Sequence, residues 1–306
     1  MKKNLLYIAN FEMSLPIIGV SVRARKFIEF LSKEYNLHLV NLRGWGHTRG
    51  DQEEAKLVDH SHILQNISSV TELDFTRFGH FVFSWSLLRV AEKLMREVRF
   101  DIIVADYGTS AIYGYLLSNR FGVPWVYSAH NVEYLRNYSL ARYDFKRFFY
   151  VPYIYIVERI GCKAGLVVTV SENDAEVFRR WAGNDKILVI PIGFDEKEYH
   201  PFYNPLPSTP PVILFYGNYS NLPNLQAINI IFKDILSQVI QRFPNAVFQF
   251  VGANPPRGFV HQSVEFTGFV DNLIDYIRRA NVVIVPILSG GGMRTKIIES
   301  LACGKI

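Results

Sequence analysis

The 306-residue sequence is poor in cysteine and has no long apolar run. Its two cysteines, Cys162 and Cys303, exclude a disulfide framework and a CxxC zinc pair. The longest apolar run, residues 148–157, is interrupted by Pro152 and is shorter than the roughly 20 residues that a membrane-spanning helix needs. The apolar start at residues 5–9 is too short for a signal-peptide core. These absences predict a cytoplasmic protein without a membrane-spanning segment.

Two phosphate-binding signatures are also missing: the P-loop pattern GxxxxGK[ST], and GxGxxG after the first strand. Their absence argues against NTPase and dinucleotide-binding functions. The net charge of +5 favours anionic partners. The basic residues are dispersed and lack zinc-finger spacing or an RNA-binding aromatic motif, so nucleic acid is not expected as a partner.

What the sequence does contain is an alternation of short apolar runs with helix-like segments. Near-continuous Val, Ile and Leu runs are typical of parallel strands covered on both faces, and their alternation with helices predicts βαβ units. Strands are expected at residues 5–10, 101–106, 124–130, 165–171, 187–193, 212–218, 246–252, 264–268 and 281–288. Helices are expected at residues 21–35, 171–182, 224–242, 272–279 and 293–302, the second with Ser171 as its N-cap.

Five prolines between residues 201 and 211 exclude a continuous helix or central strand there. We therefore expect an N-terminal domain at residues 1–198, a linker at 199–211 and a C-terminal domain at 212–306. Both domains are predicted to be doubly wound, Rossmann-like α/β domains. Ligands of such sheets bind at the carboxyl ends of the strands, so two domains that face each other would form one cleft.

A glycine-rich loop follows the last predicted strand. The loop, Ser289, Gly290, Gly291 and Gly292, precedes a helix that Gly304 is expected to end. Glycines allow backbone N–H groups to approach an anion, and the helix N-terminus favours phosphate there. The loop is therefore a candidate diphosphate site.

Helical spacing divides the side chains of the next helix between two faces. Thr295, Lys296 and Glu299 are expected to share one face, and the buried stripe is expected to consist of Ile297, Ile298 and Leu301. Glu299 could then accept two hydrogen bonds from a ribose diol. The alternative is a glycine-rich turn beside a solvated Lys–Glu pair.

Five segments in order resemble the retaining GT-B glycosyltransferases, specifically the glycosyltransferase family 4 (group 1) type. The segments are FGVPWVYSAHNVEY, AGLVVTVSENDAEVF, VIPIGFD, FYGNYSNLPN with FQFVGANPP, and GFVDNLIDYIRRANVVIVPILSGGGMRTKIIESLACGK. The resemblance covers essentially the whole chain. It implies transfer of a sugar from a nucleotide-diphosphate donor with retention at the anomeric carbon, without a metal or other cofactor. The implied acceptor is a glycan, a lipid-linked compound or a small molecule.

The resemblance also implies roles for individual residues. Glu299 falls on the acidic position that holds the ribose, whereas Gly291 occupies the position of the family's first carboxylate, so the amides of Gly291 and Gly292 would substitute for it. The family's Arg and Lys pair after the first strand of the second domain is replaced by a segment that begins with Asn218, a further donor-binding candidate. Neutralisation of the diphosphate is assigned to Arg294 or Lys296.

Two candidates lie in the first domain. His130 ends a predicted strand and, by the resemblance, contacts the donor sugar and orients the transferring carbon. As a lone histidine it could equally be a structural residue. Gly19 precedes a helix and is either an ordinary loop glycine or a point of close approach to donor phosphate or acceptor.

Residues 136–163 interleave basic and aromatic side chains. Such a helix can lie peripherally on an anionic membrane surface, which would make a lipid-linked acceptor plausible. It can also be a core-facing helix with a basic rim.

Two other functions compete with the transferase hypothesis. A nonenzymatic nucleotide-sugar or glycan-binding relative is favoured by Gly291 at the first acidic position and by the end of the chain at Ile306. In the resembling family a further strand and closing helices follow the Glu299 helix, so the second domain is expected to be incomplete and weakly active alone. An epimerase or phosphorylase of this shape would need catalytic carboxylates and histidines that cannot be placed here.

Overall fold

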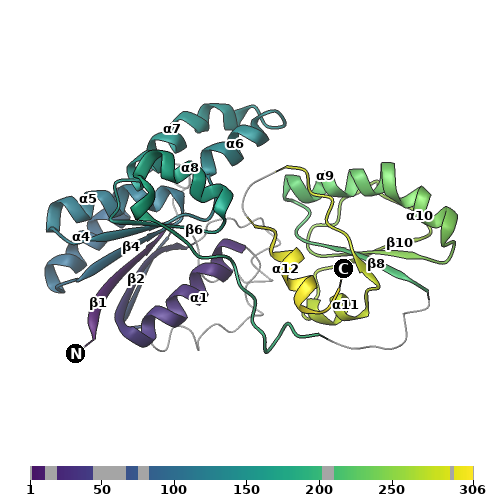
Figure 1. Ribbon diagram of the computed structural model, residues 1–306, viewed down its shortest axis with the longest axis horizontal. Helices are drawn as coiled ribbons and strands as arrows, with labels where there is room; N and C mark the ends of the chain where they lie inside the picture. The colour runs from purple at the N-terminus through teal and green to yellow at the C-terminus, as the bar shows by residue number, and fades with distance from the viewer. Residues whose placement is uncertain are drawn as a thin grey trace. The chain divides into compact units, whose positions relative to one another are not determined.

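The computed structural model describes residues 2–10, 19–43, 67–74, 83–201, 210–289 and 293–305 (Figure 1). The chain divides into two compact units, one built from Met1–Pro191 and one from Ile192–Gly290 and Arg294–Ile306. The division falls before the expected end of the first domain at residue 198. The reason is that Arg278 Nη2 donates to the backbone oxygen of Glu198 at 3.2 Å, and Tyr199 packs against the core of the second unit. Residues 202–209 of the expected linker lie outside the described residues.

The first unit contains a seven-stranded parallel sheet in the order β3-β2-β1-β4-β5-β6-β7. The five strands expected from the sequence are present, and two further strands, β2 and β3, extend the sheet beyond β1. The strands are β1 (Lys3–Ala9), β2 (Tyr35–Arg43), β3 (Ser69–Asp74), β4 (Ile102–Asp106), β5 (Trp125–Ser128), β6 (Leu166–Thr169) and β7 (Ile187–Val189).

Helices cover both faces of this sheet, because alternate residues of its strands point to opposite sides. Leu5 and Tyr7 of β1 pack in the cluster that contains Ala24 and Ile28 of α1, whereas Leu6 packs in the larger cluster on the other face. The helices of the unit are α1 (Gly19–Glu34), α4 (Trp85–Glu97), α5 (Ala111–Phe121), α6 (Glu133–Ala141), α7 (Lys146–Gly161) and α8 (Glu172–Ala182), with short 3₁₀ turns at Gly108–Ser110 and Asn184–Lys186.

Two details of these helices bear on the sequence analysis. Ser171 caps α8 as expected, because its Oγ accepts a hydrogen bond from the amide of Asp174 at 3.2 Å. Across the part of the chain that the structure describes, we find no helix with the length and apolar character that a bilayer crossing demands.

The second unit contains a four-stranded parallel sheet in the order β10-β9-β8-β11, again with helices on both faces. Phe215 of β8 packs with α9, and Leu214 packs on the opposite face with Ile277 of α11 and Cys303. The elements are β8 (Val212–Tyr216), α9 (Leu222–Ile230), the π-helix η4 (Ile231–Ile235), α10 (Leu236–Arg242), β9 (Val247–Val251), β10 (Val264–Gly268), α11 (Leu273–Arg279), β11 (Val282–Val283) and α12 (Thr295–Ala302).

The expected strand at residues 281–288 is much shorter in the structure. Only Val282 and Val283 form a ladder with β8, and the amide of Ile284 adds one more hydrogen bond, to the oxygen of Leu214 at 2.9 Å. Beyond them Pro286 has no N–H group to donate, so the segment leaves the sheet before the glycine loop.

Candidate functional site

Each sheet has one point where the strand order reverses, and ligands of open parallel sheets bind outside the carboxyl ends of the strands at that point. The reversal lies between β1 and β4 in the first unit and between β8 and β11 in the second. Polar side chains gather at both places, and most of the residues predicted from the sequence are among them. The two groups belong to separate units and are described separately.

In the second unit, Lys296 of α12 reaches back to the carboxyl end of β8. Its Nζ donates to the backbone oxygen of Tyr216 at 2.7 Å and to Asn224 Oδ1 at 3.0 Å, and it lies 4.6 Å from the centre of the Phe215 ring. Burial, together with the charge of Arg294, lowers the pKa of Lys296 from 10.5 to about 8, against the opposing effect of Glu299. The amine is therefore a partly desolvated cation with two donors already engaged.

Glu299 lies one turn further along α12. Its Oε2 is 2.9 Å from the hydroxyl of Tyr216, and among the described residues no hydrogen bond reaches Oε1. Burial raises the pKa of Glu299, while the Tyr216 hydroxyl and Lys296 oppose that rise. The carboxylate is thus held in place by one oxygen and keeps acceptor capacity on the other.

The buried stripe of α12 differs from the one expected. Ile297 and Leu301 are 43% and 60% exposed, whereas Ser300 and Cys303 are buried. The helix turns its polar side inward because the Lys296 amine inserts against the Phe215 ring and the Tyr216 hydroxyl lies 2.9 Å from the oxygen of Lys296. The prediction that Ile297, Ile298 and Leu301 form the buried stripe is therefore wrong.

The ends of α12 also differ in part from the expectation. The helix begins at Thr295, two residues later than expected, with Arg294 at the N-cap position. Gly304 ends it as expected: with φ of +73° its amide bonds to the oxygen of Leu301, and the Lys305 amide bonds to the oxygen of Ser300, both at 2.9 Å. This pair of bonds is a Schellman motif, which a glycine in the left-handed region makes possible.

Two glycines let the carboxyl ends of β8 and β9 approach closely. Gly252 has φ of +139°, and a Cβ added to it would lie 2.1 Å from the oxygen of Gly217. A Cβ on Gly217, with φ of +148°, would lie 2.7 Å from Asn224 Nδ2 and 3.1 Å from Lys296 Nζ. Neither position can hold a side chain. The backbone at the carboxyl ends of β8 and β9 therefore lies within reach of α12.

The remaining donor-site candidates lie around this edge. The Ser289 hydroxyl donates to Gln226 Oε1, and Arg294 Nη2 donates to the oxygen of Ser289 at 2.8 Å. Asn218 Oδ1 accepts from the Ser220 amide at 3.0 Å and organises the loop after β8. The predictions for Gly290, Gly291 and Gly292 lie outside the described residues.

In the first unit, His130 lies two residues beyond β5 and is buried, with 6% exposure. Its Nε2 is 2.9 Å from Oδ1 of Asp106, the last residue of β4. Burial alone would raise the pKa of Asp106, but the neighbouring His130 and Arg23 lower it more, so the net shift is downward. A charged carboxylate thus fixes the orientation of the imidazole.

The same cluster contains a strained backbone and a buried cation. Tyr107 follows Asp106 with φ of +72°, a value that costs a non-glycine residue about 1–3 kcal/mol, and its ring lies 5.9 Å from that of His130. Arg23 of α1 donates through Nη1 to Ser128 Oγ at 3.0 Å and lies over the Phe27 ring, while its buried Nε and Nη2 have no hydrogen-bond partner among the described residues. Gly19 is the first residue of the same helix.

Several of these residues were not identified from the sequence. Asp106 and Tyr216 are the last residues of β4 and β8, and Asn224 comes from α9. The position of polar residues at strand ends was a usable signal for the first two, whereas only the fold brings Asn224 to Lys296. In the described ranges, no three His, Cys, Asp or Glu side chains are grouped so as to hold a metal ion.

Comparison with solved structures supports this architecture over almost the whole chain. Sucrose-phosphate synthase from Thermosynechococcus elongatus matches with a TM-score of 0.70 and 18% identity, covering 99% of this chain and 80% of that one. HepE from Anabaena, solved with UDP and glucose, matches with a TM-score of 0.67 and 14% identity, covering 99% and 79%. The chain therefore has the GT-B fold, two tandem Rossmann-like domains.

Sequence comparison is more specific. D-inositol 3-phosphate glycosyltransferase from Stackebrandtia nassauensis is 32% identical over 108 residues, which are 33% of this chain and 23% of that relative. The chain thus aligns with less than a quarter of this curated relative. A family model described as Glycosyl transferases group 1 matches residues 210–306. The model described as Glycosyltransferase Family 4 matches residues 17–198, more than half of the sequence, and the resemblance read from the motifs is confirmed: the chain belongs to glycosyltransferase family 4.

Proposed function

We propose that this chain transfers a sugar from a nucleoside-diphosphate donor to an acceptor, with retention of the anomeric configuration. The family is that of glycosyltransferases, and HepE, a neighbour of the same fold, has been solved with UDP-glucose. The observation that carries the proposal is the group of Lys296, Glu299 and Tyr216 at the strand reversal of the second unit, since ligands of open parallel sheets generally bind at such a point.

In this proposal Glu299 binds the ribose. A carboxylate that is anchored through Oε2 by Tyr216 and has no hydrogen bond to Oε1 among the described residues suits a diol, which offers two O–H donors. Hydrogen bonds to a charged group contribute about 1.5–3 kcal/mol each. Anchoring by Tyr216 reduces the freedom that the carboxylate loses when the ribose binds.

Lys296 and Arg294 then face the diphosphate, together with the amides of Gly290, Gly291 and Gly292. Departure of the nucleoside diphosphate concentrates negative charge on its phosphate oxygens. Fixed cations and amides aimed at those oxygens stabilise the transition state more than the ground state. Burial and Arg294 lower the pKa of Lys296 more than Glu299 raises it, so the ammonium is only partly compensated and a bound anion would compensate it further.

His130 orients the donor sugar rather than attacking it. Its Nε2 is engaged with Asp106, which holds the imidazole in one orientation at the carboxyl end of the sheet. Neither a metal nor another cofactor is part of this proposal. The acceptor is a glycan, a lipid-linked compound or a small molecule.

A second candidate function is nucleotide-sugar binding without turnover. It is favoured by Gly291, which occupies the position where the family's motif has a carboxylate for the donor sugar. The two functions differ in one measurement. Turnover of a nucleotide sugar, by transfer or hydrolysis, supports the enzyme, whereas saturable binding without turnover supports the binding protein.

The donor site can be tested with nucleotides alone. Thermal unfolding with UDP, GDP or ADP identifies the preferred base, because a ligand of the native state raises the unfolding temperature. Glu299→Ala should then weaken the preferred nucleotide by about 1.5–3 kcal/mol in a calorimetric titration. Glu265→Ala, which removes an exposed carboxylate on β10, serves as the matched control. Unchanged affinity in Glu299→Ala would exclude its role at the ribose.

The stereochemistry needs a separate experiment. Proton NMR of the first product formed from an α-linked nucleotide sugar reports the configuration of its anomeric carbon. An α product supports retention, and a β product formed before mutarotation contradicts it.

A further inference from the structure

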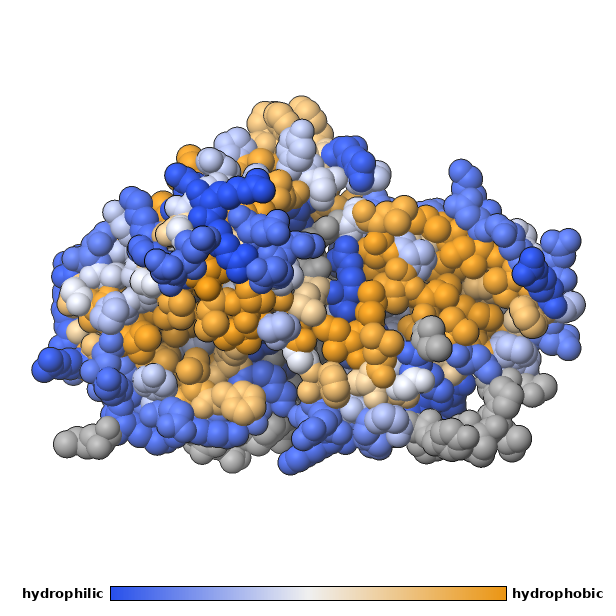
Figure 2. All heavy atoms as spheres, viewed as in Figure 1, coloured by the Kyte–Doolittle hydropathy of each residue, from blue (hydrophilic) through white to orange (hydrophobic). Residues whose placement is uncertain are grey.

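The corner between α6 and α7 carries an unusual group of exposed rings. Phe145 and Phe149 are 69% and 72% exposed, although aromatic side chains normally bury much of their surface. Figure 2 shows apolar side chains at the top of the first unit, above α6 and α7. We call this group the aromatic corner, and its members are Tyr138, Tyr143, Phe145, Phe148 and Phe149.

The rings of the corner are held as a group. Phe145 and Phe148 stack with 6.1 Å between ring centres, and Phe149 lies edge-on to Phe145 at 5.2 Å. The three phenylalanine rings therefore form one exposed apolar group. Since α7 also turns a core face inward, with Ile154 and Val157 buried, the fold of the helix does not require these outward rings.

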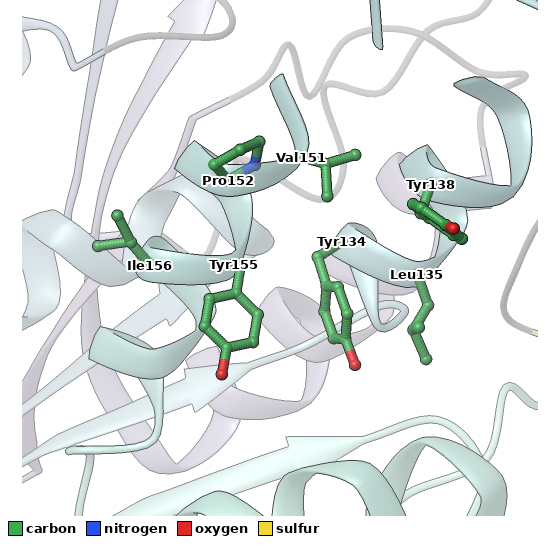
Figure 3. A pocket seen from close by; sticks show the side chains of 7 residues that line it. All are labelled: Tyr134, Leu135, Tyr138, Val151, Pro152, Tyr155 and Ile156. Atoms are coloured by element: carbon green, nitrogen blue, oxygen red, sulfur yellow. The ribbon is translucent and has the colours of Figure 1, made fainter. Parts of the chain in front are cut away.

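An apolar groove continues from this corner between the two helices. It encloses about 460 Å³, and Figure 3 shows the side chains that line it: Tyr134, Leu135, Tyr138, Val151, Pro152, Tyr155 and Ile156. The rings of Tyr134 and Tyr155 meet edge to face at 5.3 Å along one wall. A groove with this apolar lining matches a hydrocarbon chain rather than a polar ligand.

The exposed charge around the aromatic corner is mainly positive. Residues 133–163 contain six Lys and Arg and three Asp and Glu, a net charge of +3 out of the +5 of the chain. Two of the three acids, Glu133 and Glu158, are buried, and Asp144 is paired with Arg147 at 3.3 Å. Four cations of this segment are exposed, Arg142, Lys146, Arg159 and Lys163, and we call the first three the rim cations.

We propose that the aromatic corner is a docking face for an anionic phospholipid bilayer. Rings at the corner would enter the interface between headgroups and acyl chains, the groove would accept an acyl chain, and the three rim cations would pair with lipid phosphates. The excess of positive charge beside the exposed rings favours an anionic lipid surface over a protein partner, whose interface normally presents both signs in balance. This inference does not depend on the proposed function, because it concerns a surface separate from the strand ends.

Vesicle flotation of the full chain tests the proposal. We expect the chain to float with vesicles of phosphatidylcholine containing 30% phosphatidylglycerol, to bind pure phosphatidylcholine weakly, and to dissociate as salt is raised. Arg142→Gln with Lys146→Gln and Arg159→Gln should weaken binding about 100-fold, at about 1 kcal/mol per cation. Phe145→Ser with Phe148→Ser and Phe149→Ser should weaken it at least roughly tenfold.

Two matched controls separate this face from general effects of charge and apolar area. Lys93→Gln with Arg96→Gln and Arg99→Gln removes the same charge from α4 and the turn after it, and Phe30→Ser with Phe243→Ser removes rings of similar exposure elsewhere. Both controls should bind vesicles like the parent chain. Absence of vesicle binding, or equal binding by all variants, would overturn the proposal. Sedimentation of the parent chain and of the triple phenylalanine variant tests self-association. If the parent chain does not bind vesicles and forms a dimer, and the variant is a monomer, the aromatic corner is a self-association surface instead.

Discussion

Raising the pH is a direct way to ask whether Lys296 binds the diphosphate. In the free protein the pKa of Lys296 is lowered to about 8, first by burial and then by Arg294. A bound diphosphate favours the protonated amine and so raises that pKa. If the anion restores the ordinary value of 10.5, the affinity falls by a factor of ten per pH unit between the two values and is nearly constant below them. We therefore expect the nucleoside diphosphate to bind about tenfold more weakly at pH 9 than at pH 7.

Isothermal titration calorimetry at pH 7, 8, 9 and 9.5 measures this profile, and buffers of different ionisation enthalpy report the protons taken up. Lys296→Met keeps the aliphatic chain but cannot be protonated, so its affinity should be low and independent of pH over this range. Lys233→Met, an exposed lysine on η4, should retain the slope of the parent chain. A parent affinity that changes by less than twofold between pH 7 and 9 would refute the role of Lys296, as would an unchanged slope in Lys296→Met.

Three further predictions concern the two strand reversals. Gly252→Ala should lower the free energy of unfolding, measured by urea denaturation, by about 3 kcal/mol, because the added Cβ would meet the oxygen of Gly217. As a control, Gly193→Ala should leave the free energy of unfolding nearly unchanged, because its Cβ would point into open space. Equal stability of the two variants would contradict the close approach of Gly252 and Gly217. Tyr216→Phe should weaken a ribonucleoside diphosphate by about 1 kcal/mol and its 2′,3′-dideoxy analogue by less, measured calorimetrically. His130→Ala should lower turnover of the nucleotide sugar and leave the affinity for the free nucleoside diphosphate intact, and full activity would return His130 to a structural role.

The sequence predicted the near-continuous apolar strands and missed two strands, β2 and β3, in which apolar and polar residues alternate. β1, β4 and β8 are near-continuous apolar runs, so their periodicity identified them directly. β2 and β3 alternate apolar and polar residues, as in SVTELD, which at six residues is a weak signal beside helices and loops. The length of β11 was overestimated because an apolar run of seven residues, 282–288, does not reveal that Pro286 ends the ladder.

The site was predicted less completely than the fold, and the face of α12 shows why. Helical spacing correctly places Ile297 and Leu301 on one face of α12. It cannot tell which face of the helix packs against the sheet when the polar residues have buried hydrogen-bond partners. Here the partners of the polar side, Tyr216 and Asn224, come from β8 and α9 and are about 70 to 85 residues away in sequence. Apolar residues were assumed to be the buried ones, and the hydrogen bonds of Lys296 reverse that assignment.

The inward turn of Lys296 also links the stability of the second unit to its ligand. Because the pKa of the lysine is lowered in the folded state, the cost of burying its charge is present below pH 8 and is relieved as the pH rises from 8 to 10.5. At neutral pH Lys296 is thus protonated in the folded unit, although the folded unit would be more stable with a neutral amine at this position. An anion at the mouth of α12 removes that cost without a change in pH, since it supplies the missing opposite charge. If the proposed donor site is correct, the same unfavourable desolvation that weakens the empty unit would make a diphosphate bind more tightly, because the positive charge would already be in position.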